Sequence, residues 1–488
     1  MLEQNDTRRG ARIQDLLRLP RAEALRARAE ILDYVLSLRL YCVTMSCCNR
    51  RDLAHDLIFP TLLFAALGGM TWAIRGCSGF GGANGCIFAG VTWGAAWWFI
   101  ARDPSGAQSR RYASAWIILA LTVGIGISGA RGWMQWPSFF NGHLQTNAAT
   151  GEWVPISRAY GFLWLFIAGV PWAGIGACML AWCGSERRTR IWHWGLRIAC
   201  GIGAALLARF LFDHLPEVFL PLYKTMKSQY HDFGANPNLR RLINDSRSAI
   251  IHLGLYLGFL LYEVVRRDWK NVKLILTVGL VSGMGWSLCQ NWQWASRLWP
   301  TASFNWWRCW ESSGGISIGI AYGLAYYLVN RRTSERDSAL QGSRLPNGHP
   351  NLDRFGLYLG LLLGLGLSIR NGLKGWANIY LGNEEYWSRV FWMYVGPLML
   401  ICFAALVAWV LLRRLPRDFQ GDVFPHAYRI IWLVLITQNV IAQLVTGPPT
   451  AWNEMAFSIY YILLFLISAV IIFHYHFTKL RCSTQEPI

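Results

Sequence analysis

The stretch 57–101 reads LIFPTLLFAALGGMTWAIRGCSGFGGANGCIFAGVTWGAAWWFIA and sets the pattern for the chain. An apolar run over 57–75 is followed, after a short glycine-rich link, by a second run over 83–101. Each run is close to the ~20 residues that a helix needs to cross about 30 Å of hydrocarbon. The stretch therefore predicts two membrane-spanning helices. The glycines of the link favour either close helix packing or a bent segment that presents backbone groups to a ligand.

The composition extends this pattern to the whole chain. Hydrophobic residues make up 54% of the 488 residues and charged residues only 15%, against roughly 25% charged in ordinary globular domains. A soluble protein of this length has no means of hiding so much apolar surface from water. The net charge of +19 does not indicate nucleic-acid binding, because the basic residues form short clusters between apolar runs rather than one patch.

The apolar runs predict an all-α polytopic membrane protein with about twelve spans. A count of eleven remains open if one run is only interfacial. The expected spans are 57–75, 83–101, 112–131, 157–183, 192–212, 247–265, 272–291, 308–330, 355–373, 391–412, 428–447 and 454–476. They divide the chain into an Arg-rich segment with a possible amphipathic helix over 1–55 and a first six-helix half over 56–265. A second six-helix half over 266–476 and a tail over 477–488 follow.

The basic residues predict the orientation of these spans. About two thirds of the 46 Lys and Arg residues fall in the N-terminal segment and in alternate loops, and the others lie mainly in the opposite loops and at the opposite span ends. Cytoplasmic loops carry an excess of Lys and Arg in membrane proteins. We therefore expect both termini to be cytoplasmic and the protein to reside in the plasma membrane, which is the inner membrane if the source is bacterial.

Short matches between the two halves predict an internal repeat. The first span contains GMTW at 69–72 and the seventh GMGW at 283–286, and the third contains GIGIS at 124–128 and the ninth GLGLS at 364–368. The second and eighth spans, and the fourth and tenth, also share small-residue matches in the same order. Since six is an even number, the two halves would share one orientation, as in transporters built from parallel repeats.

Twelve helices in two six-helix halves with both termini inside resemble the major facilitator superfamily of secondary transporters. The loop after the second span adds a loose likeness to that family's signature loop, with different spacing, through Gly94, Asp103, Gly106, Arg110 and Arg111. The resemblance implies alternating access of a solute site that lies between the halves.

Ionisable residues in or near the spans are the first candidates for this site, because burying charge in a membrane is costly. Glu311, at the end of the eighth span, is the candidate for proton coupling. Arg75, Arg131 and Arg370 end the first, third and ninth spans on the same side, where a guanidinium can hold a substrate carboxylate. The alternative is that each charge reaches the headgroups by snorkelling.

Tryptophan and neutral amides complete the expected substrate site. Among the 27 Trp residues, many fit an interfacial aromatic belt, but Trp72 and Trp286 sit deeper and offer rings for stacking on a sugar or an organic cation. Asn291 is the amide assigned to substrate binding. The further neutral polar candidates are Gln290, Asn371, Gln438, Asn439 and Gln443.

We therefore expect a transporter of a small polar or anionic solute, such as a sugar or sugar acid, possessing no cofactor and no metal and binding no nucleic acid. The alternative is a membrane-embedded transferase for a lipid-linked or acylated substrate, with its site in the loop 213–246. That loop holds the acid and base candidates Asp213, His214, Glu217, His231 and Asp232. A sensor or assembly subunit is a third alternative. The lipid bilayer is the one partner that the sequence identifies, and the oligomeric state stays open.

Overall fold

The computed structural model describes residues 53–76, 80–102, 112–129, 136–184, 189–302, 304–330, 350–412 and 423–484. Leu57–Ile488 form one compact unit, separate from Met1–Asp56. The predicted amphipathic helix of the N-terminal segment lies outside the described residues. So do Asp103, Gly106, Arg110 and Arg111 of the loop that resembles a signature loop.

A helix lies over each apolar run that the sequence predicts as a span. The long helices are α3 (Phe59–Arg75), α4 (Ala83–Ala101), α5 (Trp116–Ser128), α7 (Ala159–Trp182), α8 (Ile191–His214), α11 (Pro237–Val265), α12 (Trp269–Cys289), α14 (Trp306–Asn330), α16 (Pro350–Tyr380), α17 (Glu384–Leu412), α18 (Val423–Leu444) and α19 (Trp452–Thr484). Within the described residues, nine helices are long and apolar enough to cross a membrane. The protein is therefore an all-α, multi-pass integral membrane protein, and the count of twelve spans stays a prediction, as does the cytoplasmic location of the termini.

The short elements lie between these helices. They are η1 (Ala54–Ile58), α6 (Trp136–Phe139), β1 (His143–Asn147), β2 (Glu152–Pro155), α9 (Pro216–Phe219), α10 (Lys227–His231), η2 (Gln290–Trp294) and α13 (Ala295–Leu298). Strands β1 and β2 form an antiparallel hairpin in which Leu144 pairs with Val154, and an irregularity follows Gln145. Helix α19 continues past the expected span end at 476 into the predicted tail.

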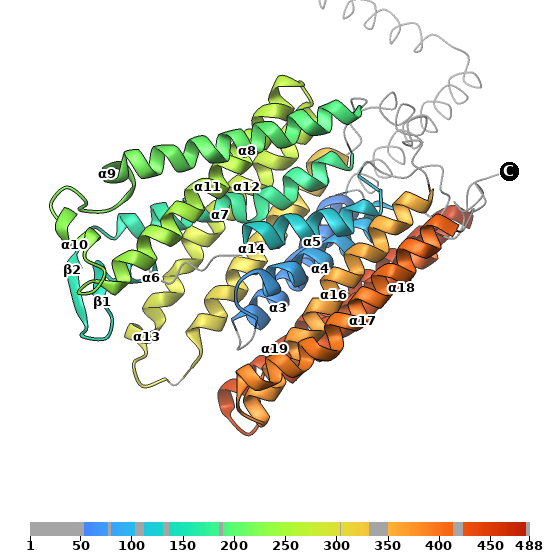
Figure 1. The fold of residues 1–488 in the computed structure, drawn as a ribbon. Coiled ribbons are helices and arrows are strands. Elements are labelled where there is room, and N and C mark those ends of the chain that lie inside the picture. Colours follow the sequence, from blue (N-terminus) through green and yellow to red (C-terminus); the bar gives the residue numbers. More distant parts are fainter. Residues whose placement is uncertain are drawn as a thin grey trace, which may run out of the picture. The chain divides into compact units, whose positions relative to one another are not determined.

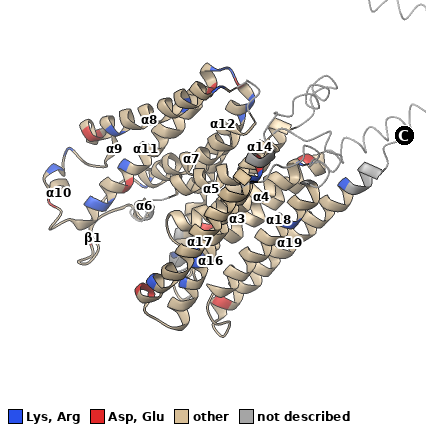
Figure 2. Cartoon of the chain, turned by 45° about the vertical axis from the view of Figure 1, so that its right-hand side comes forward, with Lys and Arg blue, Asp and Glu red and all other residues tan. Residues whose placement is uncertain are grey.

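Six helices form a closed circuit at the centre of the compact unit (Figure 1). Helix α3 packs on α4, α4 on α5, α5 on α7, α7 on α12, α12 on α14, and α14 closes the circuit on α3. We call α3, α4, α5, α7, α12 and α14 the six-helix ring. Lys, Arg, Asp and Glu lie mostly toward the ends of the helices (Figure 2), as expected where the middle of each helix is in hydrocarbon.

Glycine permits the closest approaches within the ring. A Cβ added to Gly68 of α3 would lie 2.3 Å from the carbonyl oxygen of Gly315 in α14, and one added to Gly315 would lie 2.2 Å from that of Gly68. Gly169 of α7 likewise approaches Gly283 of α12. Small residues at helix interfaces let backbones approach in lipid, where no hydrophobic force drives helices together. These contacts bring the side chains of facing helices into one narrow interior.

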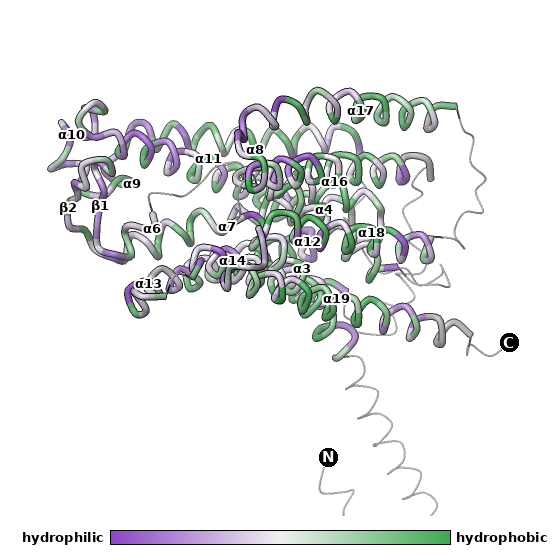
Figure 3. The backbone as a smooth tube through the Cα atoms, turned by 90° about the horizontal axis from the view of Figure 1, so that it is seen from below, coloured by the Kyte–Doolittle hydropathy of each residue, from purple (hydrophilic) through white to green (hydrophobic). Residues whose placement is uncertain are grey.

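Two groups of helices flank the ring. Helix α8 packs on α11 and α11 packs on α7, whereas α16, α18 and α19 pack against α3, α4 and α5. Helix α17 packs chiefly on α16, and no part of its apolar stretch is buried. Beyond its hydrophilic first turns, its hydropathy is that of a lipid-facing helix (Figure 3).

The ring does not follow the predicted boundary at 265/266. It takes α3, α4, α5 and α7 from the first predicted half and α12 and α14 from the second. Helix α7 packs closely on α12, while its expected counterpart α17 has no comparable contact with α3. The helix contacts of the two halves thus differ, and the superposition of the halves stays a prediction.

Candidate functional site

A buried ion pair links the first and last helices of the ring. Arg75, the last residue of α3, donates through Nη1 to Oε1 and Oε2 of Glu311 in α14, at 2.7 and 2.9 Å. The two side chains are 5% and 2% exposed. Glycine spacing sets this meeting, because the approach of Gly68 to Gly315 aligns the helices and no side chain at Gly76 separates that turn from Glu311. Arg75 and Glu311, which the sequence nominates separately as a substrate-binding and a proton-coupling candidate, thus lie in direct contact.

A buried charge pair of this kind is costly to hold. Each ion loses several kcal/mol of hydration on burial, and the attraction between them often does no more than offset that loss. Within membrane helices such residues are rare and mark functional sites by default. The Arg75–Glu311 pair is therefore a candidate functional site.

Aromatic rings fill the interior of the six-helix ring next to this pair. We call Trp72, Trp93, Trp172, Trp286, Trp310 and Tyr322 the central aromatic cluster; each is 2% exposed or less. Trp72 stacks on Trp93 at 5.4 Å between centroids and lies 6.3 Å from Trp286 across the ring. Trp172 lies 4.8 Å from Trp286. Much of the deep tryptophan content thus fills the interior of the ring and does not belong to an interfacial belt.

The guanidinium of Arg75 joins the ion pair to this cluster. Its Cζ atom lies 4.8 Å from the centroid of the Trp172 ring, a distance at which the negative face of an aromatic ring attracts a cation. Trp172 in turn lies 5.9 Å from Trp72. One continuous site therefore offers a cation, a carboxylate and several aromatic faces.

Three side chains in this part of the ring carry polar atoms that are buried and without a hydrogen-bond partner among the described residues. They are Nε1 of Trp72, Nε of Arg75, and both Oε1 and Nε2 of Gln290. Gln290 follows Trp286 by four residues and begins η2 directly after the end of α12. Buried polar groups are nearly always satisfied in native proteins, so these atoms are free to bond a solute or water. The unsatisfied atoms add donors and an acceptor to the charged pair.

Of the other predicted substrate-binding residues, Arg370 does not join this site. Arg370 donates to the backbone oxygen of Ser388 at 3.0 Å, to its Oγ at 2.5 Å and to Asn371 at 2.9 Å, all within α16 and α17. Asn291 is exposed in η2. Arg131 lies outside the described residues. The sequence groups the three arginines by depth, but depth does not say which helices are neighbours.

A second buried pair has no counterpart in the sequence prediction. Arg197 of α8 and Glu263 of α11 lie 2.7 Å apart, with both side chains 0% exposed. Asn271 donates to Glu263 at 3.0 Å and accepts from the hydroxyl of Tyr112 at 2.7 Å. Trp97 then donates to the backbone oxygen of Tyr112. This network ties α8 and α11 to the ring at the end opposite to Arg75, and the one available sequence signal is an arginine inside a span.

Four of the five acid and base candidates of the loop 213–246 make local structural contacts, and Glu217 is exposed. Asp213 pairs with Arg247 at 2.8 Å, and His214 contacts the backbone oxygen of Phe210 at 2.9 Å. His231 contacts the hydroxyl of Tyr223. The partners of Asp213 and His214 are thus Arg247 and a backbone oxygen rather than each other. Across the described residues, no group of three His, Cys, Asp or Glu side chains is placed to hold a metal ion.

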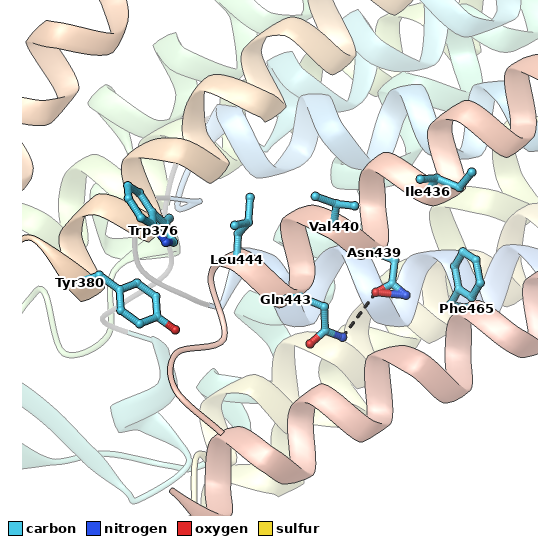
Figure 4. A pocket seen from close by; sticks show the side chains of 8 residues that line it. All are labelled: Trp376, Tyr380, Ile436, Asn439, Val440, Gln443, Leu444 and Phe465. Atoms are coloured by element: carbon cyan, nitrogen blue, oxygen red, sulfur yellow. Dashed lines mark hydrogen bonds between the residues drawn. The ribbon is translucent and has the colours of Figure 1, made fainter. Parts of the chain in front are cut away.

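A groove of about 450 Å³ lies away from the ring interior, between α16, α18 and α19 (Figure 4). Asn439 and Gln443 of α18 line it, together with Trp376 of α16 and Phe465 of α19. Gln438 points the other way and donates to the Leu67 backbone oxygen and to Thr71 of α3. The three amides of α18 therefore do not line one path, because adjacent helical residues differ in direction by about 100°.

Comparison with known proteins gave no match to a family model, to a curated protein or to a solved structure.

Proposed function

We propose that the protein is a membrane transporter for a small polar solute and that its binding site is centred on Arg75 and Glu311. The observation that carries the proposal is the buried pair between α3 and α14, beside aromatic rings and unsatisfied donors. A buried ion pair is costly to hold, and ionisable residues within membrane helices are candidates for function by default. We place the protein in the plasma membrane with both termini in the cytoplasm.

In this proposal the ion pair opens during transport. A proton taken up by Glu311 neutralises the carboxylate and releases Arg75, whose guanidinium then holds an acceptor group of the solute. Trp72 and Trp286 supply apolar faces for a sugar ring, and Gln290 supplies a donor and an acceptor. A sugar or a sugar acid fits this set of groups. The six-helix ring would alternate between states that open to either side of the membrane, as the resemblance to the major facilitator superfamily implies.

Uptake by the purified protein in liposomes tests the proposal directly. A panel of labelled neutral sugars, sugar acids and small organic anions is applied with a proton gradient, and wild type is expected to accumulate at least one class. Glu311→Gln is expected to abolish gradient-driven accumulation, because glutamine has the shape of the acid but cannot exchange a proton.

Glu454→Gln is the matched control. Glu454 of α19 pairs with Arg308 at 2.6 Å. Arg308 lies in α14, the helix that carries Glu311, but it does not belong to the central aromatic cluster. We expect this variant to keep uptake near the wild-type level. The proposal is rejected if wild type accumulates none of the solutes, or if Glu311→Gln and wild type take up a solute equally.

A further inference from the structure

The groove between α16, α18 and α19 lies on the outside of the helix bundle. Ile436 and Val440, which line it, are 49% and 53% exposed. On the opposite side of α18, Gln438 is fully buried against α3. Because the protein is an integral membrane protein, the exposed side of α18 faces lipid.

Two amide side chains interrupt this apolar wall. Gln443 donates to Oδ1 of Asn439 at 3.4 Å and accepts from the hydroxyl of Ser458 in α19 at 2.6 Å. It also donates to the backbone oxygen of Ser458 at 3.3 Å. Gln443 is thereby satisfied, and it turns the carbonyl oxygen of Asn439 toward itself. The bond from Gln443 is the one hydrogen bond of the Asn439 side chain among the described residues, so its Nδ2 group has no acceptor there. In Figure 4 this nitrogen lies on the side away from Gln443.

An amide N–H that faces hydrocarbon without an acceptor costs several kcal/mol. The occupant of the groove must therefore carry an acceptor as well as an apolar body. The position of Asn439 narrows the choice of occupant, since Asn439 lies within two turns of the end of α18 at Leu444. Trp376 and Tyr380, in the last turns of α16, form the same end of the groove. Trp and Tyr are enriched at the headgroup level of membranes, so the amide lies near the depth of lipid ester groups.

We propose that this groove binds one glycerophospholipid. An acyl chain lies along Ile436, Val440 and Phe465, an ester carbonyl accepts from Nδ2 of Asn439, and the glycerol region contacts Trp376 and Tyr380. The groove volume of about 450 Å³ is within the usual range for sites that hold small ligands. The inference does not depend on the proposed transport function.

Native mass spectrometry of the full chain tests the site. The protein is reconstituted in vesicles of phosphatidylethanolamine and phosphatidylglycerol, extracted in a mild detergent, and examined for retained lipid. Wild type is expected to retain one phospholipid per chain. Asn439→Leu keeps a similar volume but removes the donor, so we expect about fivefold lower occupancy, the worth of one net hydrogen bond. Val440→Trp fills the groove and is expected to abolish retention.

Leu207→Trp is the control, since Leu207 is also exposed, at 58%, but belongs to α8, which does not line the groove. It is expected to retain lipid as wild type does. Loss of retention in Leu207→Trp equal to that in Val440→Trp would overturn the assignment. So would a wild-type chain that retains no phospholipid, or that retains only detergent or a second copy of itself.

Discussion

Replacing Glu263 by glutamine is expected to lower the free energy of unfolding by about 3–5 kcal/mol, because the Arg197 guanidinium then stays buried without its counter-charge. Both side chains are fully buried, so no water is present to take over the role of the carboxylate. The Asn271 amide, which donates to the same carboxylate, also faces a weaker acceptor. Unfolding of the purified protein by titration with a denaturing detergent measures the change.

Two further variants separate this explanation from a general loss of packing. The double variant Arg197→Met/Glu263→Met removes both charges, and we expect it to recover most of the loss, since apolar replacements of buried pairs are often neutral or stabilising. Glu385→Gln breaks an exposed pair with Arg389, whose side chains are 78% and 75% exposed, and is expected to change stability by less than about 1 kcal/mol. A Glu263→Gln protein as stable as Glu385→Gln would show that the buried pair is not an anchor.

Replacing Gly315 by leucine is expected to prevent assembly of the ring. The first carbon of the new side chain would lie 2.2 Å from the Gly68 carbonyl oxygen and 2.6 Å from Cβ of Trp72. Overpacking a core typically costs about 1–3 kcal/mol where side chains can adjust. Here a backbone carbonyl is in the way, so α3 and α14 must separate, and the Arg75–Glu311 pair separates with them. Size-exclusion chromatography of the expressed protein measures the loss of assembly, because the variant is expected to elute as an aggregate.

Gly203→Leu is the matched control for this substitution. Gly203 lies in α8, and a Cβ added there would meet no atom within 4 Å. Leucine is also the better helix former, so this variant is expected to elute as wild type and to be at least as stable. If Gly315→Leu also elutes as wild type with an unchanged melting temperature, the close approach of α3 and α14 is wrong.

The helices could be predicted from the sequence because hydrophobicity over about twenty residues is a local property. The runs 57–75 and 83–101 coincide with α3 and α4 to within a few residues. Which helices are neighbours could not be predicted, since packing in lipid depends on the match of small residues between segments far apart in the chain. Gly68 and Gly315 are one such match, and nothing near either residue in the sequence identifies the other.

The candidate site could be predicted in part for the same reason. Residue type and depth suffice to nominate Arg75, Glu311, Trp72 and Trp286, and the structure brings these four into one interior. Arg370 has the same type and depth but packs between α16 and α17. Its neighbour depends on tertiary contacts, which depth along a helix does not encode.

The Arg197–Glu263 pair shows a different limit. Arg197 stands out as a charge inside an expected span, but its partner lies close to the end of another span, among residues that resemble an ordinary cytoplasmic boundary. Only the packing of α8 on α11 brings the two together. A charge inside a span thus predicts that a partner exists, and the structure identifies the partner.

The central claim is that Glu311 is the residue at which proton uptake opens the solute site. Labelling with the membrane-permeant reagent dicyclohexylcarbodiimide, which attacks protonated carboxyl groups in apolar surroundings, tests it most directly. Peptide mass spectrometry of protein in liposomes is expected to find Glu311 modified, faster at low pH, and more slowly when the transported solute is present. A Glu311 that stays unmodified at every pH, or that is labelled at one rate with and without the solute, would contradict the account.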